Sequence, residues 1–298
     1  MTKITFLGPF GATFSHDAYN ILAEIYGAPK VTQKNFVPAN SNSEILKLIL
    51  KHRGYGAVAM ETLAGARVSE PVESFIELLK FYKKTEDCPI HVAGAVKLRL
   101  HFCLMARPDV TSLSNIGIDG KILGHQKALQ ACRKRILKTA IPTMEVLSNG
   151  EGARLIAEDG KYANCVALGP KSASEKYGLK VLDEKFEDEE AVTTFFLIAP
   201  LKHKIKIGKE NRILIVFKIP HERGALIKAL YPFDRMSFSL IQIHSIHSGN
   251  LNYNFAIEIE VDIGKIGELN RLRIAMEIFE GCVIEYLSFG PFEVVKMV

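Results

Sequence analysis

Two patterns of apolar and polar residues alternate along the first 200 residues of the chain. Short β-rich runs at residues 3–8 and 55–60 are typical of strands, and the second is expected to be buried. Longer segments have apolar positions three and four residues apart, as in residues 72–84, and this spacing predicts helices with one buried face. Such alternation of strands and helices indicates an α/β fold around a mostly parallel sheet.

Polar residues and glycines mark the expected ends of the first helices. Residues 13–27 have a helical pattern with Ser15 near its start and Gly27 as its stop. Ser43 precedes the helical pattern of residues 44–52 and is the expected N-cap of that helix. We therefore expect two capped helices within the first 52 residues.

The pattern of expected strands and helices changes after residue 85. Long strands are expected within residues 90–106, followed by an amphipathic helix over residues 125–138. A helix, a strand and another helix follow within residues 150–179, and residues 192–200 form a final strand pattern. We expect two small α/β lobes divided near residue 85, with the last strand returning to the first lobe and a cleft for a small ligand between them.

A basic, glycine-containing linker at residues 201–210 precedes a separate C-terminal unit. Its expected elements are a strand, a helix, two strands, a helix and a strand, at residues 212–219, 224–233, 238–248, 251–262, 265–279 and 282–290. This βαββαβ order is typical of a ferredoxin-like fold.

Composition indicates a globular protein and narrows its partners. The 298 residues are 48% hydrophobic and 24% charged, without a low-complexity tract. The formal net charge of +5 is spread thinly, because acidic residues interrupt the lysines and arginines almost everywhere. We expect weak attraction of small anions and no nucleic-acid partner.

Cysteine usage and apolar run lengths favour a cytoplasmic protein. The cysteines are odd in number and form neither a CxxC motif nor a cluster at metal-ligand spacing: Cys88, Cys103, Cys132, Cys165 and Cys282. No apolar run approaches the roughly 18 residues of a membrane span, and the first residues lack the pattern of a signal peptide. We therefore expect reduced thiols, a cytoplasmic location and no membrane partner.

Polar residues at the ends of elements are the first candidates for chemistry. In LGPFGATFS, residues 7–15, the helix start and the hydroxyls of Thr13 and Ser15 either hold a carboxylate or phosphate or form a plain capping turn. Glu61 and Thr62 end a strand, and they either face a cleft or belong to a solvated loop. The residues alone leave these alternatives open.

Two further candidates lie at a helix start and in a strand. His125 stands immediately before a helix, where a histidine either donates to an anion or is incidental. Thr193 and Thr194 are adjacent in a strand and face opposite sides, so one can face a cleft while the other packs or reaches solvent. His244 and His247 likewise point to opposite faces of their strand, so no shared metal site is expected.

Six segments occur in the order of the motifs of one enzyme family. FLGPFGATFSHDA is similar to GPxGTFS, YGAVAMETLAGARV to GVVPxENSxEGxV, GHQKALQAC to SHPQALxQC, and FEDEEAVTTFFLI to EDNxxNxTRFLVI. Nearer the C-terminus, GALIKAL is similar to the GALxxxL, and YLSFGPF to the LGSYP, of an ACT domain. Over essentially its whole length the chain resembles the prephenate dehydratases, which make phenylpyruvate in phenylalanine biosynthesis.

The resemblance implies a fold and a division into domains. The implied fold is α/β, with a two-lobed catalytic domain like a type II periplasmic binding protein followed by a ferredoxin-like βαββαβ ACT regulatory domain. The implied boundaries are 1–200 for the catalytic domain (lobe one about 1–85 plus 180–200, lobe two about 86–179), 201–210 for the linker and 211–298 for the ACT-like domain.

The resemblance also implies a reaction, the decarboxylating dehydration of prephenate to phenylpyruvate, with no metal and no organic cofactor. Thr193 would be catalytic and would assist departure of the ring hydroxyl. The residues implied in binding the dianionic substrate are Thr13, Ser15, Glu61, Thr62, His125, Thr194 and Phe195. Those implied in binding an amino-acid effector are Gly224, Ala225, Leu226, His244 and Ser245. ACT domains commonly pair side by side, so a homodimer or homotetramer is expected.

The chain departs from the family pattern at four places. Thr194 stands where the family has the arginine of TRF, and Thr62 and Leu63 replace the Asn and Ser of ENS. SNGEGA at residues 148–153 replaces STAEAA, and HSIH at residues 244–247 replaces ESRP. These departures leave two alternatives open: a related decarboxylase that acts on prephenate without aromatisation, and a non-catalytic protein that senses metabolites.

Overall fold

The computed structural model describes residues 1–62, 69–208, 210–247 and 253–296 of the chain. Leu63 lies outside the described residues. For Glu61 and Thr62 the backbone is described, as the end of a strand, but the side chains are not.

The chain forms two compact units, and it passes between them more than once. The first unit contains Met1–Val68, Val96–Phe195 and Lys296–Val298, and the second contains Ser69–Ala95 and Phe196–Val295. Two long strands, β4 (Ile90–Leu100) and β10 (Ala191–Pro200), therefore contribute residues to both units. The domain boundaries expected from the sequence follow a different division, which remains a prediction.

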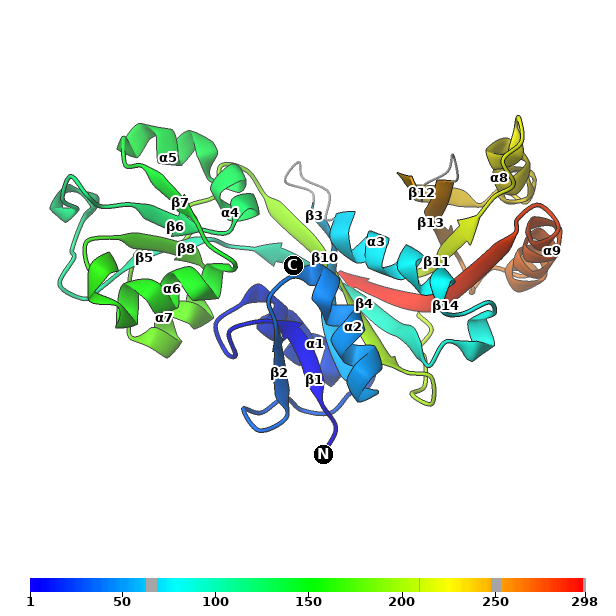
Figure 1. The fold of residues 1–298 in the computed structure, drawn as a ribbon, viewed down its shortest axis with the longest axis horizontal. Coiled ribbons are helices and arrows are strands. Elements are labelled where there is room, and N and C mark those ends of the chain that lie inside the picture. Colours follow the sequence, from blue (N-terminus) through cyan, green and yellow to red (C-terminus); the bar gives the residue numbers. More distant parts are fainter. Residues whose placement is uncertain (63–68, 209, 248–252, 297–298) are drawn as a thin grey trace. The chain divides into compact units, whose positions relative to one another are not determined.

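The first sheet of the first unit is built around a parallel core. Its strands follow one another in the order β10, β3 (Tyr55–Thr62), β1 (Ile4–Leu7) and β2 (Phe36–Ala39). Strand β1 pairs in parallel with both β2 and β3. Helices α1 (Phe14–Tyr26) and α2 (Asn42–His52) make the connections between these strands (Figure 1). Because the strands are parallel, the loops that lead into both helices lie at the same edge of the sheet.

The ends of α1 and α2 are set by side chains and by one glycine. The expected stop of α1 is confirmed, because Gly27 adopts a left-handed conformation with φ 69°. The expected cap of α2 is wrong, because Ser41 and not Ser43 accepts a hydrogen bond from the Glu44 N–H at 3.3 Å. Glu44 in turn accepts from the backbone N–H of Asn40 at 2.8 Å, which fixes the helix start one turn before Ile45.

A second sheet of five strands completes the first unit, in the order β7, β6, β8, β5, β9. β6 pairs in parallel with β7 and β8, whereas β5 pairs antiparallel with β8 and β9. The strands are β5 (Cys103–Ala106), β6 (Ile122–Gly124), β7 (Thr143–Glu145), β8 (Val166–Gly169) and β9 (Lys180–Asp183). The helices are α4 (Gln126–Ala131), α5 (Arg133–Thr139), α6 (Asn149–Glu158) and α7 (Lys171–Tyr177) (Figure 1).

One expected element is present and another is broken in this part of the chain. The strands expected within residues 90–106 are β4 and β5. The helix expected over residues 125–138 is interrupted at Cys132, whose φ of −107° and ψ of 11° are not helical. The carboxylate of Asp188 accepts from the N–H groups of Lys134 and Arg135 at 2.6 and 2.9 Å and so caps a new helix, α5.

The second unit confirms the βαββαβ order expected from the sequence. Its elements are β11 (Asn211–Lys218), α8 (Ala225–Arg235), β12 (Ser239–His247), β13 (Tyr253–Val261), α9 (Glu268–Glu280) and β14 (Glu285–Lys296). The sheet has the order β12, β13, β11, β14, with antiparallel pairing of β11 to both β13 and β14. In this unit β14 is followed by β4 and β10 in the same sheet.

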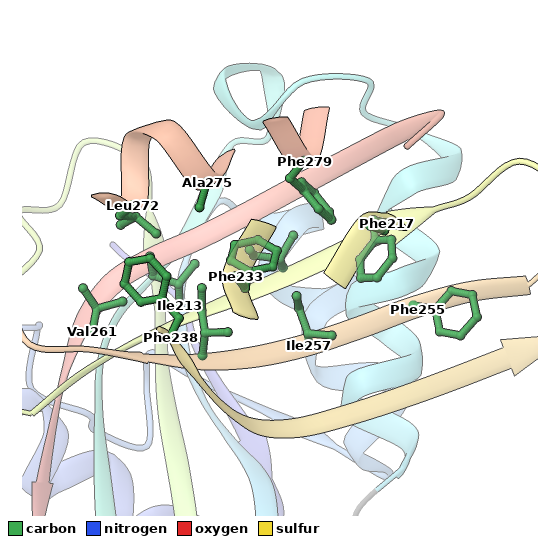
Figure 2. Packing of buried hydrophobic residues seen from close by; sticks show 13 residues of the cluster. Ile213, Phe217, Phe233, Phe238, Phe255, Ile257, Val261, Leu272, Ala275 and Phe279 are labelled. Carbon is green, nitrogen blue, oxygen red and sulfur yellow. The ribbon is translucent and has the colours of Figure 1, made fainter. Parts of the chain in front are cut away.

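Helices α8 and α9 cover one face of this sheet and enclose an aromatic core. Phe233 of α8 and Phe279 of α9 have ring centroids 5.3 Å apart, and Phe279 lies 5.1 Å from Phe217 of β11 (Figure 2). Ile257 of β13 is fully buried in the same cluster. The alternation of apolar residues in the strands and their helical spacing in α8 and α9 therefore converge on one core.

Helix α3 (Ser69–Glu77) belongs to the second unit and is shorter than expected. A 3-10 turn, Leu78–Lys80, follows it, so the helix expected over residues 72–84 ends early. The expected buried face is nevertheless present, because Phe75, Ile76 and Leu79 are at most 3% exposed. Among the described helices, none has both the length and the apolar character needed to cross a membrane.

Candidate active site

A pocket of the first unit gathers polar side chains from several element ends. It holds about 720 Å³ of empty space, its open mouth included. The polar residues that line it are Thr13, Ser15, Asn42, His125, Lys127, Ser148, Asn149 and Thr193. Apolar side chains, among them Phe14, Phe102 and Phe195, form the remaining wall. An apolar pocket with a few convergent polar groups is the usual form of a site for a small molecule.

The start of α1 presents donors to this pocket. Thr13 is the N-cap: its hydroxyl donates to the Leu7 carbonyl at 3.0 Å and accepts from the His16 N–H at 3.2 Å. The Ser15 side chain is only 5% exposed, and it forms no hydrogen bond with any residue that the structure describes. The first N–H groups of a helix have no partner within the helix, so Ser15 and the α1 amides are available to an anionic ligand.

The start of α2 contributes a polar group without a partner. Asn42 is the first residue of that helix and lines the pocket. Its side-chain oxygen is buried and accepts no hydrogen bond from the described residues. A buried polar atom of this kind is satisfied when a ligand or water occupies the pocket.

The start of α6 brings the two sheets of the first unit together. The hydroxyl of Ser148 accepts from the Glu151 N–H at 3.1 Å, as a helix cap, and donates to the Gly8 carbonyl at 2.7 Å. Gly150 permits this approach, because a Cβ built there would lie 2.4 Å from the Ala12 carbonyl oxygen. The α6 amides therefore meet the loop that precedes α1.

The start of α4 adds a histidine and a lysine. The backbone N–H of His125 donates to the side-chain oxygen of Asn149 at 2.8 Å, which ties the starts of α4 and α6 together. His125 Nδ1 accepts from the backbone N–H of Lys127 at 3.4 Å. Lys127 is the one residue with a permanent charge among the described residues that line the pocket.

Strand β10 sends alternate side chains into the pocket. Thr193 and Phe195 line it, whereas Thr194, which is 4% exposed, is not among the described lining residues. This arrangement follows from the twofold alternation of side chains along a strand.

The pocket is suited to a small anion that carries carboxylates. The N-termini of α1 and α6 carry partial positive charge, and the Lys127 ammonium adds a full charge. The hydroxyls of Ser15 and Thr193 can donate hydrogen bonds. Within the described residues, no group of three or more histidine, cysteine, aspartate or glutamate side chains is arranged to hold a metal ion.

No cysteine is among the described residues that line this pocket. All five are free. Burial, followed by the Glu184 carboxylate, raises the pKa of the Cys103 thiol to about 11. Burial also raises the pKa of the Cys132 thiol. These two thiols are therefore neutral near pH 7, and neutral thiols are poor nucleophiles.

The sequence anticipated part of this constellation. The structure brings together Thr13, Ser15, His125, Thr193 and Phe195 in one pocket. The sequence reasoning missed four lining residues: Asn42, Lys127, Ser148 and Asn149. All four lie at helix starts, which the sequence pattern can predict. Only the folded chain shows that these helices start around the same pocket.

The residues named for an effector lie in the second unit. Gly224 precedes α8 with a φ of 77°, and Ala225 and Leu226 pack into the core of that unit. His244 and Ser245 lie on β12. Their role in binding an effector remains a prediction.

The fold and the pocket define an α/β protein with a pocket suited to small anions, followed in the chain by a ferredoxin-like unit. The sequence profile described as prephenate dehydratase matches residues 4–203, more than half of the 298 residues. The chain belongs to the prephenate dehydratase family.

Individual proteins agree with this assignment. A prephenate dehydratase of Methanocaldococcus jannaschii is 32% identical over 184 residues, which cover 60% of this chain and 65% of that protein. The chain spans 64% to 65% of the length of this and two other curated relatives, both named bifunctional chorismate mutase/prephenate dehydratase.

Solved structures share the fold at low identity. A prephenate dehydratase from Arthrobacter aurescens, in complex with L-Phe, has a TM-score of 0.78 and 21% identity, covering 98% of this chain and 90% of that one. GqqA, titled a novel type of quorum quenching acylase, has a TM-score of 0.74 and 19% identity, covering 97% of both chains. Because proteins of different named activities share this fold, the likeness establishes the fold alone.

Proposed function

We propose that the protein is a prephenate dehydratase, a carbon–oxygen lyase that converts prephenate to phenylpyruvate, CO2 and water. One observation carries the proposal: in a member of this family, Thr193 lines the same pocket as Ser15 and the helix starts that favour carboxylates. The pocket offers hydroxyl donors for a leaving hydroxyl and a positive environment for a dianion.

The proposed mechanism needs little covalent chemistry from the protein. The bond between the ring and its carboxylate breaks, and its electron pair enters the ring as CO2 departs. The carbon–oxygen bond of the ring hydroxyl breaks at the opposite side of the ring. The oxygen leaves with the electron pair of that bond as hydroxide, which takes up a proton from solvent to form water. Thr193 donates a hydrogen bond to this oxygen, while the helix amides hold the carboxylates.

Turnover of prephenate tests the proposal. Purified protein should convert prephenate to phenylpyruvate, followed by the absorbance of the enol. Thr193→Val keeps the shape of the side chain and should lower kcat at least about 100-fold, whereas Thr193→Ser keeps the hydroxyl and should retain most of it. Prephenate loss without phenylpyruvate would instead support the decarboxylase, and no consumption of prephenate would support the sensor.

The finer expectations about regulation belong to the same proposal. The ferredoxin-like unit would be an ACT-like domain that binds an amino-acid effector near Gly224, Ala225, Leu226, His244 and Ser245. HSIH at residues 244–247 replaces the family's ESRP, so L-phenylalanine should not inhibit turnover at concentrations effective on family members that carry ESRP. Strong inhibition would contradict this expectation.

Assembly and location complete the proposal. β12 is the last strand of its sheet, and Leu240, Ile243 and Tyr253 on β12 and β13 are 40% to 45% exposed. An exposed apolar edge of this kind supports a homodimer or homotetramer, which sedimentation velocity would detect. The free cysteines support a cytoplasmic location.

A further inference from the structure

Lys127 occupies the pocket at a place where the family pattern has no cation. The residue belongs to HQKAL, where the family has HPQAL, so that a lysine stands in place of a glutamine. Its side chain is half-buried and lines the pocket together with Thr193 and Ser15. The backbone of Lys127 is held in the first turn of α4, because its N–H donates to His125 Nδ1 at 3.4 Å.

The family pattern places its cation elsewhere, at the arginine of TRF. In this chain the corresponding residue is Thr194, which is buried and absent from the described lining of the pocket. A hydroxyl cannot replace the charge of a guanidinium. Among the described lining residues, the permanent positive charge is therefore on α4 and not on β10.

A dianionic ligand needs more positive charge than the helix starts provide. Each helix N-terminus is equivalent to roughly half an elementary charge, and the effect is limited to the first turn. An apolar wall that includes Phe14, Phe102 and Phe195 weakens the hydration of any anion in the pocket. A full charge within the pocket offsets this cost, and Lys127 supplies it.

From these observations we infer that Lys127 binds a carboxylate of the substrate. The inference rests on the proposed function and specifies which carboxylate of prephenate is bound. The ring carboxylate loses its charge as it becomes CO2, so a lysine held against it would stabilise the ground state and slow the reaction. The carboxylate of the 2-oxo acid side chain keeps its charge throughout, and this is the group that Lys127 binds.

Binding of a group that does not change during the reaction predicts a particular kinetic signature. Lys127→Met and Lys127→Gln should raise KM for prephenate about 10-fold to 100-fold, with kcat within about threefold of the original enzyme. Lys127→Arg keeps the charge and should restore most of the affinity. Lys138→Met is the matched control, because Lys138 is an exposed lysine of α5 and the substitution changes net charge equally. It should leave KM unchanged.

A stable dicarboxylate separates this inference from the proposed reaction. Binding of 1,1-cyclohexanediacetate to the full chain, measured by titration calorimetry, should weaken at least about tenfold in Lys127→Met and stay unchanged in Lys138→Met. Loss of this binding without any turnover of prephenate by the original protein would support Lys127 as the anion-binding residue while rejecting the dehydratase. Equal affinity of Lys127→Met and the original protein, or an equal loss in Lys138→Met, would overturn the inference.

Discussion

Thr13 and Ser15 lie two residues apart at the start of α1, yet their hydroxyls have different roles. Thr13 donates to Leu7 and accepts from His16, so both of its hydrogen-bonding functions serve the helix start. Ser15 is buried in the pocket wall without a hydrogen bond to any described residue. The first hydroxyl therefore stabilises the protein, and the second is available to the substrate.

Alanine substitutions should separate these two roles. Thr13→Ala removes the cap and should lower the free energy of unfolding by about 1 kcal/mol. Ser15→Ala should change it by less than about 0.5 kcal/mol but lower kcat/KM about tenfold or more, as expected for one lost hydrogen bond to a charged group. Urea unfolding and the phenylpyruvate assay measure the two effects. Thr13→Ser is the control, and a large stability loss in Ser15→Ala would contradict the assignment.

His91 is a buried histidine of the second unit that is not suited to carry charge. Its side chain is 7% exposed, and its Nε2 has no hydrogen-bond partner among the described residues. Burial, followed by repulsion from His203, lowers the pKa of His91 from 6.5 to about 4. The ring of His203 lies 6.4 Å away, centroid to centroid. His91 is therefore neutral in the native state down to a lower pH than an exposed histidine.

This pKa predicts a loss of stability in acid. Between pH 6.5 and about 4 the unfolded state binds a proton that the native state does not, so stability falls as the pH is lowered through this window. His91→Phe should remove on the order of 2 kcal/mol of this fall, measured by urea unfolding between pH 4 and 8. The exposed His52→Gln is the control, and equal pH profiles for His91→Phe and the original protein would exclude the effect.

At the scale of elements, the pocket depends on how closely the start of α6 approaches the loop before α1. Ser148 donates to Gly8 across this contact at 2.7 Å. At Gly150 a built Cβ would lie 2.4 Å from the Ala12 carbonyl and 2.8 Å from Pro9. At Gly152, on the same helix, the nearest atoms are side-chain carbons at 3.3 Å or more. The backbone leaves no room for a side chain at the first of these positions.

Gly150→Ala should therefore force the two elements apart. We expect a loss of about 1–3 kcal/mol in the free energy of unfolding, together with a lower kcat/KM, because Ser15 and the α6 amides no longer face the same ligand. Gly152→Ala adds the same methyl group and the same gain in helix propensity, and should stay within about 1 kcal/mol. Thermal unfolding and the prephenate assay compare the pair. Equal effects of both substitutions would show that the close approach is not needed.

The elements also show what the sequence can predict. The stop of α1 at Gly27 and the βαββαβ order were predictable, because both depend on local residue types and spacing. The break at Cys132 was not, because the cap of α5 comes from Asp188, more than 50 residues away. The entry of Asn42 and Lys127 into one pocket also depends on tertiary packing, which no local pattern records.

At the scale of the whole molecule, the chain order does not coincide with the compact units. Residues 69–95 belong to the second unit, with residues 196–295. Within it, Phe75 of α3 packs against Phe289 of β14 at 5.0 Å between ring centroids, and the Ser288 N–H donates to the Thr85 hydroxyl at 3.0 Å. A segment that lies early in the sequence is thus part of the core formed by the C-terminal strands.

Hydrogen exchange should reveal these units as separate cooperative regions. Phe75→Leu removes part of a fully buried ring and should weaken the second unit by about 1–2 kcal/mol, which raises amide exchange about 10-fold in residues 69–95 and 211–295. Phe6→Leu is the matched change in the first unit, where Phe6 packs against Phe36, and should raise exchange in β1–β3 instead. Mass spectrometry of peptides from both variants in mild denaturant compares them. If exchange in peptides from residues 69–95 rises in Phe6→Leu, the segment belongs to the first unit and the expected division is wrong. If both substitutions raise exchange equally throughout the chain, the molecule opens as one unit and the division is also wrong.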